Sequence, residues 1–191
     1  MEYLSLFIGA TLVTNIILAS FLGICPVIGV SKKVSSALGM GGAVIFVTVV
    51  SSAATWLIYH LLLVGLGLEF MRTIVFILIV ASLVQFVEMF MKKFTPALYK
   101  VLGVFLPLMA TNCAIIGAAL INIDRDFTFT STIVHAFGVS IGFTLVIFIF
   151  STIRERLETS NTPEGFKGVP IALVVVTIMA MGFFGFVGLG S

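Results

Sequence analysis

Apolar residues occur along the chain in six long runs, which short polar segments separate. An α-helix needs roughly 20 such residues to cross the hydrocarbon core of a membrane. We therefore expect six transmembrane helices, over residues 3–23, 37–63, 70–91, 98–121, 130–151 and 168–189. The predicted fold class is an all-α membrane protein, with residues 1–191 forming a single domain.

The composition supports a membrane protein and argues against a catalytic domain within this chain. Apolar residues make up 60% of the chain and charged residues 9%, which leaves too little polar surface for a compact soluble domain. The segments between the runs are too short to form a catalytic domain. We expect membrane lipid around the protein, no nucleic-acid partner, and no catalytic residue in this chain, so any catalytic domain must belong to a partner.

The basic residues indicate an orientation. Of the ten Lys and Arg residues, two lie in the segments on one side, Arg72 and Arg125. The other eight share the opposite side: Lys32, Lys33, Lys92, Lys93, Lys100, Arg154, Arg156 and Lys167. Because basic loops remain in the cytoplasm, we expect both termini on the outer face.

The two halves of the chain, about 1–94 and 95–191, resemble each other weakly. Each half has a cysteine motif in or just after its first helix and an Ala-x-Gly near the start of its second, at Ala37 and Ala136. A duplicated unit of three helices enters the membrane in opposite senses, which predicts inverted repeats. Matches this sparse also arise by chance, so spacing alone leaves the repeat open.

The cysteine motifs predict breaks in helices 1 and 4, the first helix of each half. Gly23 and Pro26 flank Cys25, and Pro107 precedes Cys113 by less than two turns. Proline removes a helix donor and clashes with the preceding turn, and a broken helix is tolerated in a membrane only inside protein or around a bound group. Pro and Gly can also simply kink a transmembrane helix, which is the alternative for each motif.

Three roles are open to a chain with two cysteines. A disulfide is one, although no Cys-x-x-Cys pair typical of thiol-exchange enzymes is present. Inert packing of two small thiols is the second. Metal ligation is the third, and because iron-sulfur clusters usually take four cysteines, it requires two more from another subunit.

Taken together, the motifs resemble the A subunits of the Rnf ion-translocating oxidoreductases over the full length of the chain. The E subunits of the sodium-pumping NADH:quinone oxidoreductases are also similar, but Pro26 and the residues before Cys113 fit the Rnf branch better. The segments that carry the resemblance are Phe21–Pro26, Val30–Lys33, Leu98–Tyr99, Leu102–Pro107, Thr111–Ile115, Phe137–Gly138, Ile153–Arg156 and Gly165–Gly168.

The resemblance implies a cofactor and partners. In this family, the A-type protein pairs with the homologous Rnf E membrane subunit, and two cysteines from each hold one [2Fe-2S] cluster. Here the ligands would be Cys25 and Cys113. The whole complex, with further subunits B, C, D and G, transfers electrons between ferredoxin and NAD and translocates sodium or protons across the prokaryotic inner membrane. This chain would be a membrane electron relay within that translocase.

A few other polar residues are candidates for a role in ion or ligand handling. We expect Thr111 and Asn112 to orient the ligand sulfurs, since they directly precede Cys113. Glu88 and Asn15 are possible ion-path residues because polar groups within membrane helices are often functional. Pairing of Glu88 with Lys92 one turn later, and helix-to-helix hydrogen bonding by Asn15, are the plainer explanations.

Two rival functions remain. Inverted repeats with broken helices are also typical of secondary transporters, although almost no charged residue lies inside the predicted helices to bind a polar substrate. The chain could instead be a structural membrane anchor with inert cysteines. A haem held by His60 and His135 is the least favoured alternative, since the chain has no other histidine.

Overall fold

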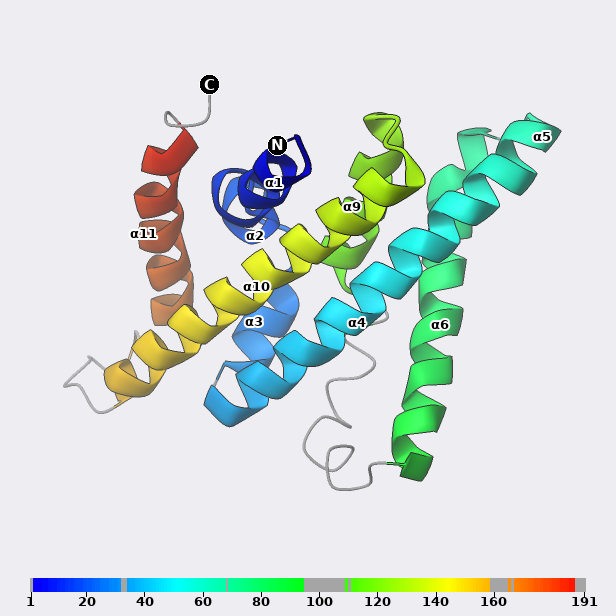
Figure 1. Ribbon diagram of the computed structural model, residues 1–191. Coiled ribbons are helices and arrows are strands. Elements are labelled where there is room, and N and C mark those ends of the chain that lie inside the picture. The colour runs from blue at the N-terminus through cyan, green and yellow to red at the C-terminus, as the bar shows by residue number, and fades with distance from the viewer. Residues whose placement is uncertain are drawn as a thin grey trace.

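The computed structural model describes residues 2–31, 34–67, 69–94, 109, 111–158, 165 and 167–187. All regular structure within these ranges is helical (Figure 1), which confirms the predicted all-α class. Pro107 and most of the predicted span 98–121 before Thr111 lie outside the described residues.

The first apolar run forms several short helices instead of one. They are α1 (Glu2–Ile8), the π-helical η1 (Gly9–Val13), α2 (Ile16–Ser20) and α3 (Ile24–Val30). Asn15 begins α2 by accepting a hydrogen bond from the Ile17 amide, and the chain leaves the helix again at Phe21, in the left-handed region at φ 54°. The predicted break beside Cys25 is therefore present.

Three of the described helices are long and apolar enough to cross a membrane: Val34–Leu63, Arg72–Phe90 and Phe129–Glu158. The first comprises α4 (Val34–Ile58) and η2 (Tyr59–Leu63), after which come α5 (Val64–Leu66) and η3 (Glu69–Met71). The others lie in α6 (Arg72–Phe94) and α10 (Phe129–Glu158). The shorter apolar helices include α9 (Cys113–Asp124) and α11 (Val169–Val187). Six crossings in an inverted repeat remain a prediction.

The two longest helices, α4 and α10, pack along each other in opposite directions (Figure 1). Near one end, the Trp56 indole donates a hydrogen bond of 2.9 Å to the Phe127 carbonyl, and its ring contacts Phe129. Further along, Gly41 lies so close to Thr144 that an added Cβ would stand 2.4 Å from the threonine methyl. Trp56 and Phe129 are thus level with each other, and so are Gly41 and Thr144.

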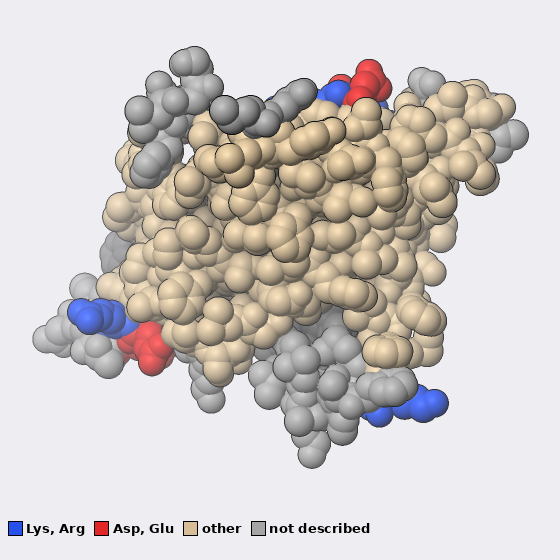
Figure 2. Space-filling view, viewed as in Figure 1, with Lys and Arg blue, Asp and Glu red and all other residues tan. Residues whose placement is uncertain are grey.

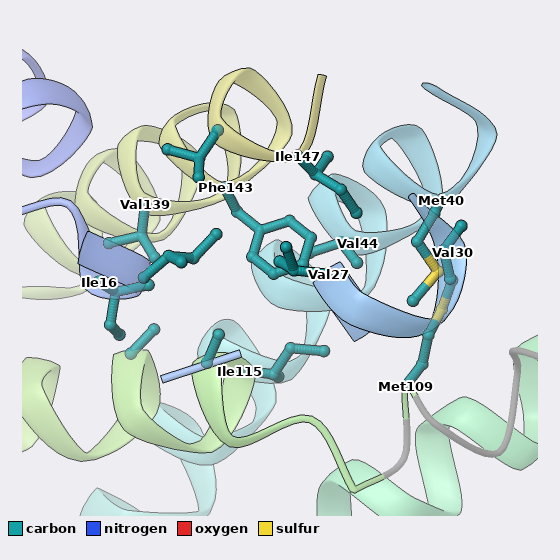
Figure 3. Packing of buried hydrophobic residues seen from close by; sticks show 14 of the residues in the cluster. Ile16, Val27, Val30, Met40, Val44, Met109, Ile115, Val139, Phe143 and Ile147 are labelled. Atoms are coloured by element: carbon teal, nitrogen blue, oxygen red, sulfur yellow. The ribbon is translucent and has the colours of Figure 1, made fainter. Parts of the chain in front are cut away.

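The apolar core lies where α10 faces α3, α4 and α9. Phe143 is 1% exposed at its centre, and Figure 3 shows its ring directed towards Val27, Val44 and Ile115. Because these residues come from helices that carry or flank the cysteine motifs, the same packing that stabilises the fold positions both cysteines.

Charged side chains gather at opposite ends of the molecule. Figure 2 shows uncharged residues over most of one face, with the blue and red side chains near its upper and lower edges. The bonded pair Arg72 and Asp124 lies at the end where α6 begins and α9 ends, whereas Lys92 and Lys93 lie at the end of α6. This arrangement suits a protein whose uncharged middle lies in the hydrocarbon core of a membrane and whose charged ends lie in water.

Candidate metal centre

Both cysteines lie in the first turn of a helix. Cys25 is the second residue of α3, and Cys113 is the first residue of α9. Pro26 is therefore the third residue of α3, where its missing N–H removes no hydrogen bond from the helix. The break in the chain is at Gly23, whose φ of 90° is one that glycine adopts without a steric cost.

Asn112 fixes the start of the second cysteine helix. Its side-chain oxygen accepts a 3.0 Å hydrogen bond from the Ala114 amide, and its backbone carbonyl accepts one from the Ile115 amide. The residue is 1% exposed, so this cap lies inside the protein. Thr111, directly before it, is exposed. Asn112 thus determines where the helix that carries Cys113 begins, and the orientation of ligand sulfurs by both residues remains a prediction.

The two motifs touch, although about 90 residues separate them in the chain. The Gly23 amide donates a hydrogen bond of 2.9 Å to the Cys113 sulfur. A Cβ added to Gly23 would stand 3.0 Å from both the Ala114 methyl and the Phe143 ring. The loop before Cys25 therefore lies directly on the helix start that carries Cys113, and only a residue without a side chain fits there.

The two cysteine helices point away from their meeting place in opposite directions. The end of α3 connects to the beginning of α4, and the end of α9 lies near the opposite end of α4, where Trp56 contacts Phe127. Figure 1 shows α3 below and α9 above the middle of the molecule. An inverted repeat would require such an opposition of the cysteine motifs, but the repeat itself and the depth of the sulfurs in a membrane remain predictions.

The chemistry available at this place is that of two reduced thiols. Cys25 is exposed, Cys113 is half-buried, and both are free, so the structure contains no disulfide between them. Within the described part of the chain, no group of three or more His, Cys, Asp or Glu side chains could hold a metal ion. The described chain thus offers two free thiols, of which Cys25 is the exposed one, and ligation of a cluster by them remains a prediction.

The other candidate residues lie away from this contact. Asn15 is 1% exposed, and besides capping α2 it donates a 3.0 Å hydrogen bond to the Thr11 carbonyl. Glu88 is half-buried on α6, one turn before Lys92. Local hydrogen bonding accounts for the burial of Asn15, and an ion path through Asn15 or Glu88 remains a prediction.

The two histidines have separate surroundings. His60 is exposed and stacks on Trp56, with 4.2 Å between the ring centroids. His135 is buried, and its Nδ1 lies 2.6 Å from the side-chain oxygen of Asn122. Each ring is thus held by a neighbour of its own.

Arg154 is a structural element of the site that sequence reasoning assigned to a solvated basic loop. The side chain is 7% exposed, and its guanidinium donates to the Ile28 carbonyl at 2.7 Å and to the Ser31 hydroxyl at 2.8 Å. Ser151, one turn earlier, donates to the Ser31 carbonyl at 3.1 Å. These bonds anchor the C-terminal end of α3, the helix that carries Cys25, to α10.

Comparison with known protein families gives a match over nearly the whole chain. Residues 3–190 match the family described as "Rnf-Nqr subunit, membrane protein". The chain belongs to the Rnf-Nqr family. The resemblance inferred from the motifs is therefore confirmed, and the protein is a multi-pass membrane protein.

Several curated members of the Rnf-Nqr family are similar along their full length. A protein of Syntrophotalea carbinolica, named as the A subunit of an ion-translocating oxidoreductase complex, is 50% identical over 186 residues, which are 97% of this chain and 96% of that protein. Proteins named in the same way from Proteus mirabilis and Azoarcus sp. are each 48% identical over 188 residues, 98% of this chain and 97% of theirs. Among the members of the Rnf-Nqr family, this chain is thus similar to those named as A subunits.

Proposed function

We propose that this chain is the A-type membrane subunit of an ion-translocating ferredoxin:NAD oxidoreductase complex. Its own share would be to relay electrons within the membrane, through half of a [2Fe-2S] cluster, while the complex translocates sodium or protons. The observation that carries the proposal is the hydrogen bond from the Gly23 amide to the Cys113 sulfur, which joins the two cysteine motifs. The names of the similar proteins support the assignment to such a complex.

The residues present fit half of such a cluster. A [2Fe-2S] cluster takes about four cysteine thiolates, and the two of this chain lie in adjacent motifs, with Cys25 exposed. We propose that the homologous E subunit covers Cys25 and supplies the other two ligands. Subunits B, C, D and G would complete the complex.

The chain contributes more than ligands. The Gly23 amide, from the first cysteine motif, donates a hydrogen bond to the Cys113 sulfur and so fixes where that sulfur lies. The Phe143 ring and the surrounding apolar core keep water from the inner side of the site. A cluster bound there would accept and return one electron at a time.

Iron analysis tests this proposal. The purified complex, with both homologous subunits present, is analysed for iron and acid-labile sulfide in the wild type, Cys25→Ala and Cys113→Ala. The clusters of the other subunits are counted separately. We expect each variant to lose about two irons per subunit pair, together with ion-coupled electron transfer.

The control for this experiment is Ser20→Ala, an exposed side chain at the end of α2 close to the first cysteine motif. It should keep its full iron content. Unchanged iron in both cysteine variants would contradict the cluster, return the two thiols to a packing role, and favour the transporter-like or anchor function.

We also propose a location and an orientation. The uncharged face between charged edges and the basic residues in the last turns of α6 and α10 support insertion in a prokaryotic inner membrane with the basic ends in the cytoplasm. Both termini would then lie on the outer face.

A further inference from the structure

Several polar atoms are buried without a partner among the described residues; one of them, the Asn112 side-chain nitrogen, lies beside Cys113, and the others lie in the helices away from it. Ser51 on α4, Asn122 on α9 and Thr132 on α10 are all at most 1% exposed. The Ser51 and Thr132 hydroxyls and the Asn122 side-chain nitrogen are buried without a hydrogen-bond partner among the described residues. The neighbouring Ser52 hydroxyl is likewise buried without a hydrogen-bond partner among the described residues.

These side chains lie at one level of the helix packing. Trp56 is level with Phe129, and Gly41 with Thr144, so the antiparallel register of α4 and α10 sets Ser51 and Ser52 within one turn of Thr132. The bond between Asn122 and His135 fixes α9 at this same level of α10. Since α9 also packs on α4, the three helices that carry the unpaired atoms are all in contact with one another.

Leaving these atoms dry is costly. A buried polar group without a partner has lost its hydrogen bonds to water and gained none in return, and a low-dielectric interior raises that cost. Three hydroxyls can both donate and accept hydrogen bonds, whereas the Asn122 amide nitrogen only donates. Water is the ligand that satisfies both kinds of group at once, since it accepts as well as donates.

A pocket opens beside this level, and His135 is the residue that lines the pocket and also contacts Asn122. It has a volume of about 480 Å³, and its lining includes Gly9, Thr14, Arg125 and His135. His135 is 4% exposed and reaches both this pocket and Asn122. One wall is the π-helical turn η1, a rare geometry that often occurs at functional sites.

We propose that Ser51, Asn122 and Thr132 hold buried water that is continuous, past His135, with the pocket beside Arg125. This hydrated compartment extends from the Arg125 end of the molecule into the helix packing. Resting on the proposed function, it would be one half of the route by which the translocated ion crosses the protein, because an ion crosses a low-dielectric interior at least cost where water accompanies it.

A map of the purified complex by electron cryo-microscopy tests the water site directly. At a resolution that shows ordered water elsewhere in the complex, we expect water density within hydrogen-bond distance of Thr132 Oγ1 and of the Asn122 amide nitrogen. Absence of density at both atoms would overturn the proposal. Loss of iron from the cysteine variants is a separate result, so failure of the proposed function would leave the water density as it is.

The near-isosteric variant Thr132→Val gives a second test. If the Thr132 hydroxyl of the wild type holds water, we expect Thr132→Val to lower the thermal midpoint of the complex and to reduce the number of ions moved per electron several-fold. Thr132→Ser should keep wild-type values. If the hydroxyl is dry, its removal relieves an unpaired group, and the midpoint rises with the ion ratio unchanged, which would overturn the proposal.

The matched control is Thr48→Val. Thr48, which lies on α4, is buried like Thr132, but its hydroxyl donates to the Val44 carbonyl at 2.7 Å. This change removes a bond within the helix and should leave the ion ratio at the wild-type value.

Discussion

At the scale of single residues, Arg154 shows how a charge is accommodated inside an apolar protein. Its guanidinium donates to the Ile28 carbonyl and the Ser31 hydroxyl, at the end of α3 where carbonyl groups lack partners within the helix. A cation there also complements the negative end of the helix dipole. The charge thus replaces part of its hydration shell with fixed oxygen atoms of the helix that carries Cys25.

Replacing Arg154 should loosen that helix. We expect Arg154→Gln to lower the thermal stability of the complex by about 3 kcal/mol, because the charge-assisted bonds are lost and their buried acceptors are left unpaired. Lys167→Gln removes an exposed positive charge that lines the same surface pocket as Arg154. Equal midpoints for the two variants in thermal unfolding would contradict the anchoring role.

Gly23 is the residue at which the two cysteine motifs meet. We expect Gly23→Ala to separate them, since its backbone is in the left-handed region and the added methyl would press on Ala114 and Phe143. Because the cysteine motifs separate, the iron content of the complex should fall in this variant. Gly42→Ala, on the exposed side of α4 with nothing within 4 Å of the new methyl, should keep its iron. Full iron in Gly23→Ala would show that the contact is dispensable.

Sequence reasoning could find Cys25 and Cys113 because glycine and proline mark departures from the helix in their neighbourhood. It could not find Arg154 or the pair of Asn122 and His135. The partners of Arg154 lie more than 120 residues away along the chain, and a basic residue at the end of an apolar run looks the same whether it is solvated or folded inward. Burial of such residues depends on tertiary packing, which no local pattern records.

At the scale of elements, the close approach of α4 and α10 depends on Gly41. We expect Gly41→Ala to destabilise the complex, because the new methyl would overlap the side chain of Thr144. Thr144→Ala removes the overlapping atoms and should recover part of the loss. Additive effects of the two changes in a double-mutant cycle of thermal stability would contradict this contact.

Helix breaks were only partly predictable. The break before Cys25 follows from Gly23, whereas the one at Asn15 depends on a side chain that forms its own hydrogen bonds to Thr11 and Ile17. Asparagine competes with the backbone in this way without leaving a periodic signal. Pro26 was expected to disrupt a helix, yet it lies in the first turn of α3, where proline is tolerated.

At the scale of the whole molecule, the distribution of charge predicts a testable orientation. In intact cells, we expect a membrane-impermeant maleimide to label Asp126→Cys, at the Arg125 end, and to leave Lys93→Cys unlabelled. Permeabilised cells should show labelling of both. Labelling of Lys93→Cys alone in intact cells would reverse the proposed orientation.

The exposed position of Cys25 also bears on biosynthesis. A chain with only two thiols offers no complete ligand set for the proposed cluster until a partner lies beside it, so under that proposal iron and sulfide would be inserted during or after pairing of the two proteins. Synthesis of this chain in excess of its partner would then leave the Cys25 thiol uncovered. Under that proposal, the two proteins would have to be produced in equal amounts for every copy of this chain to receive a cluster.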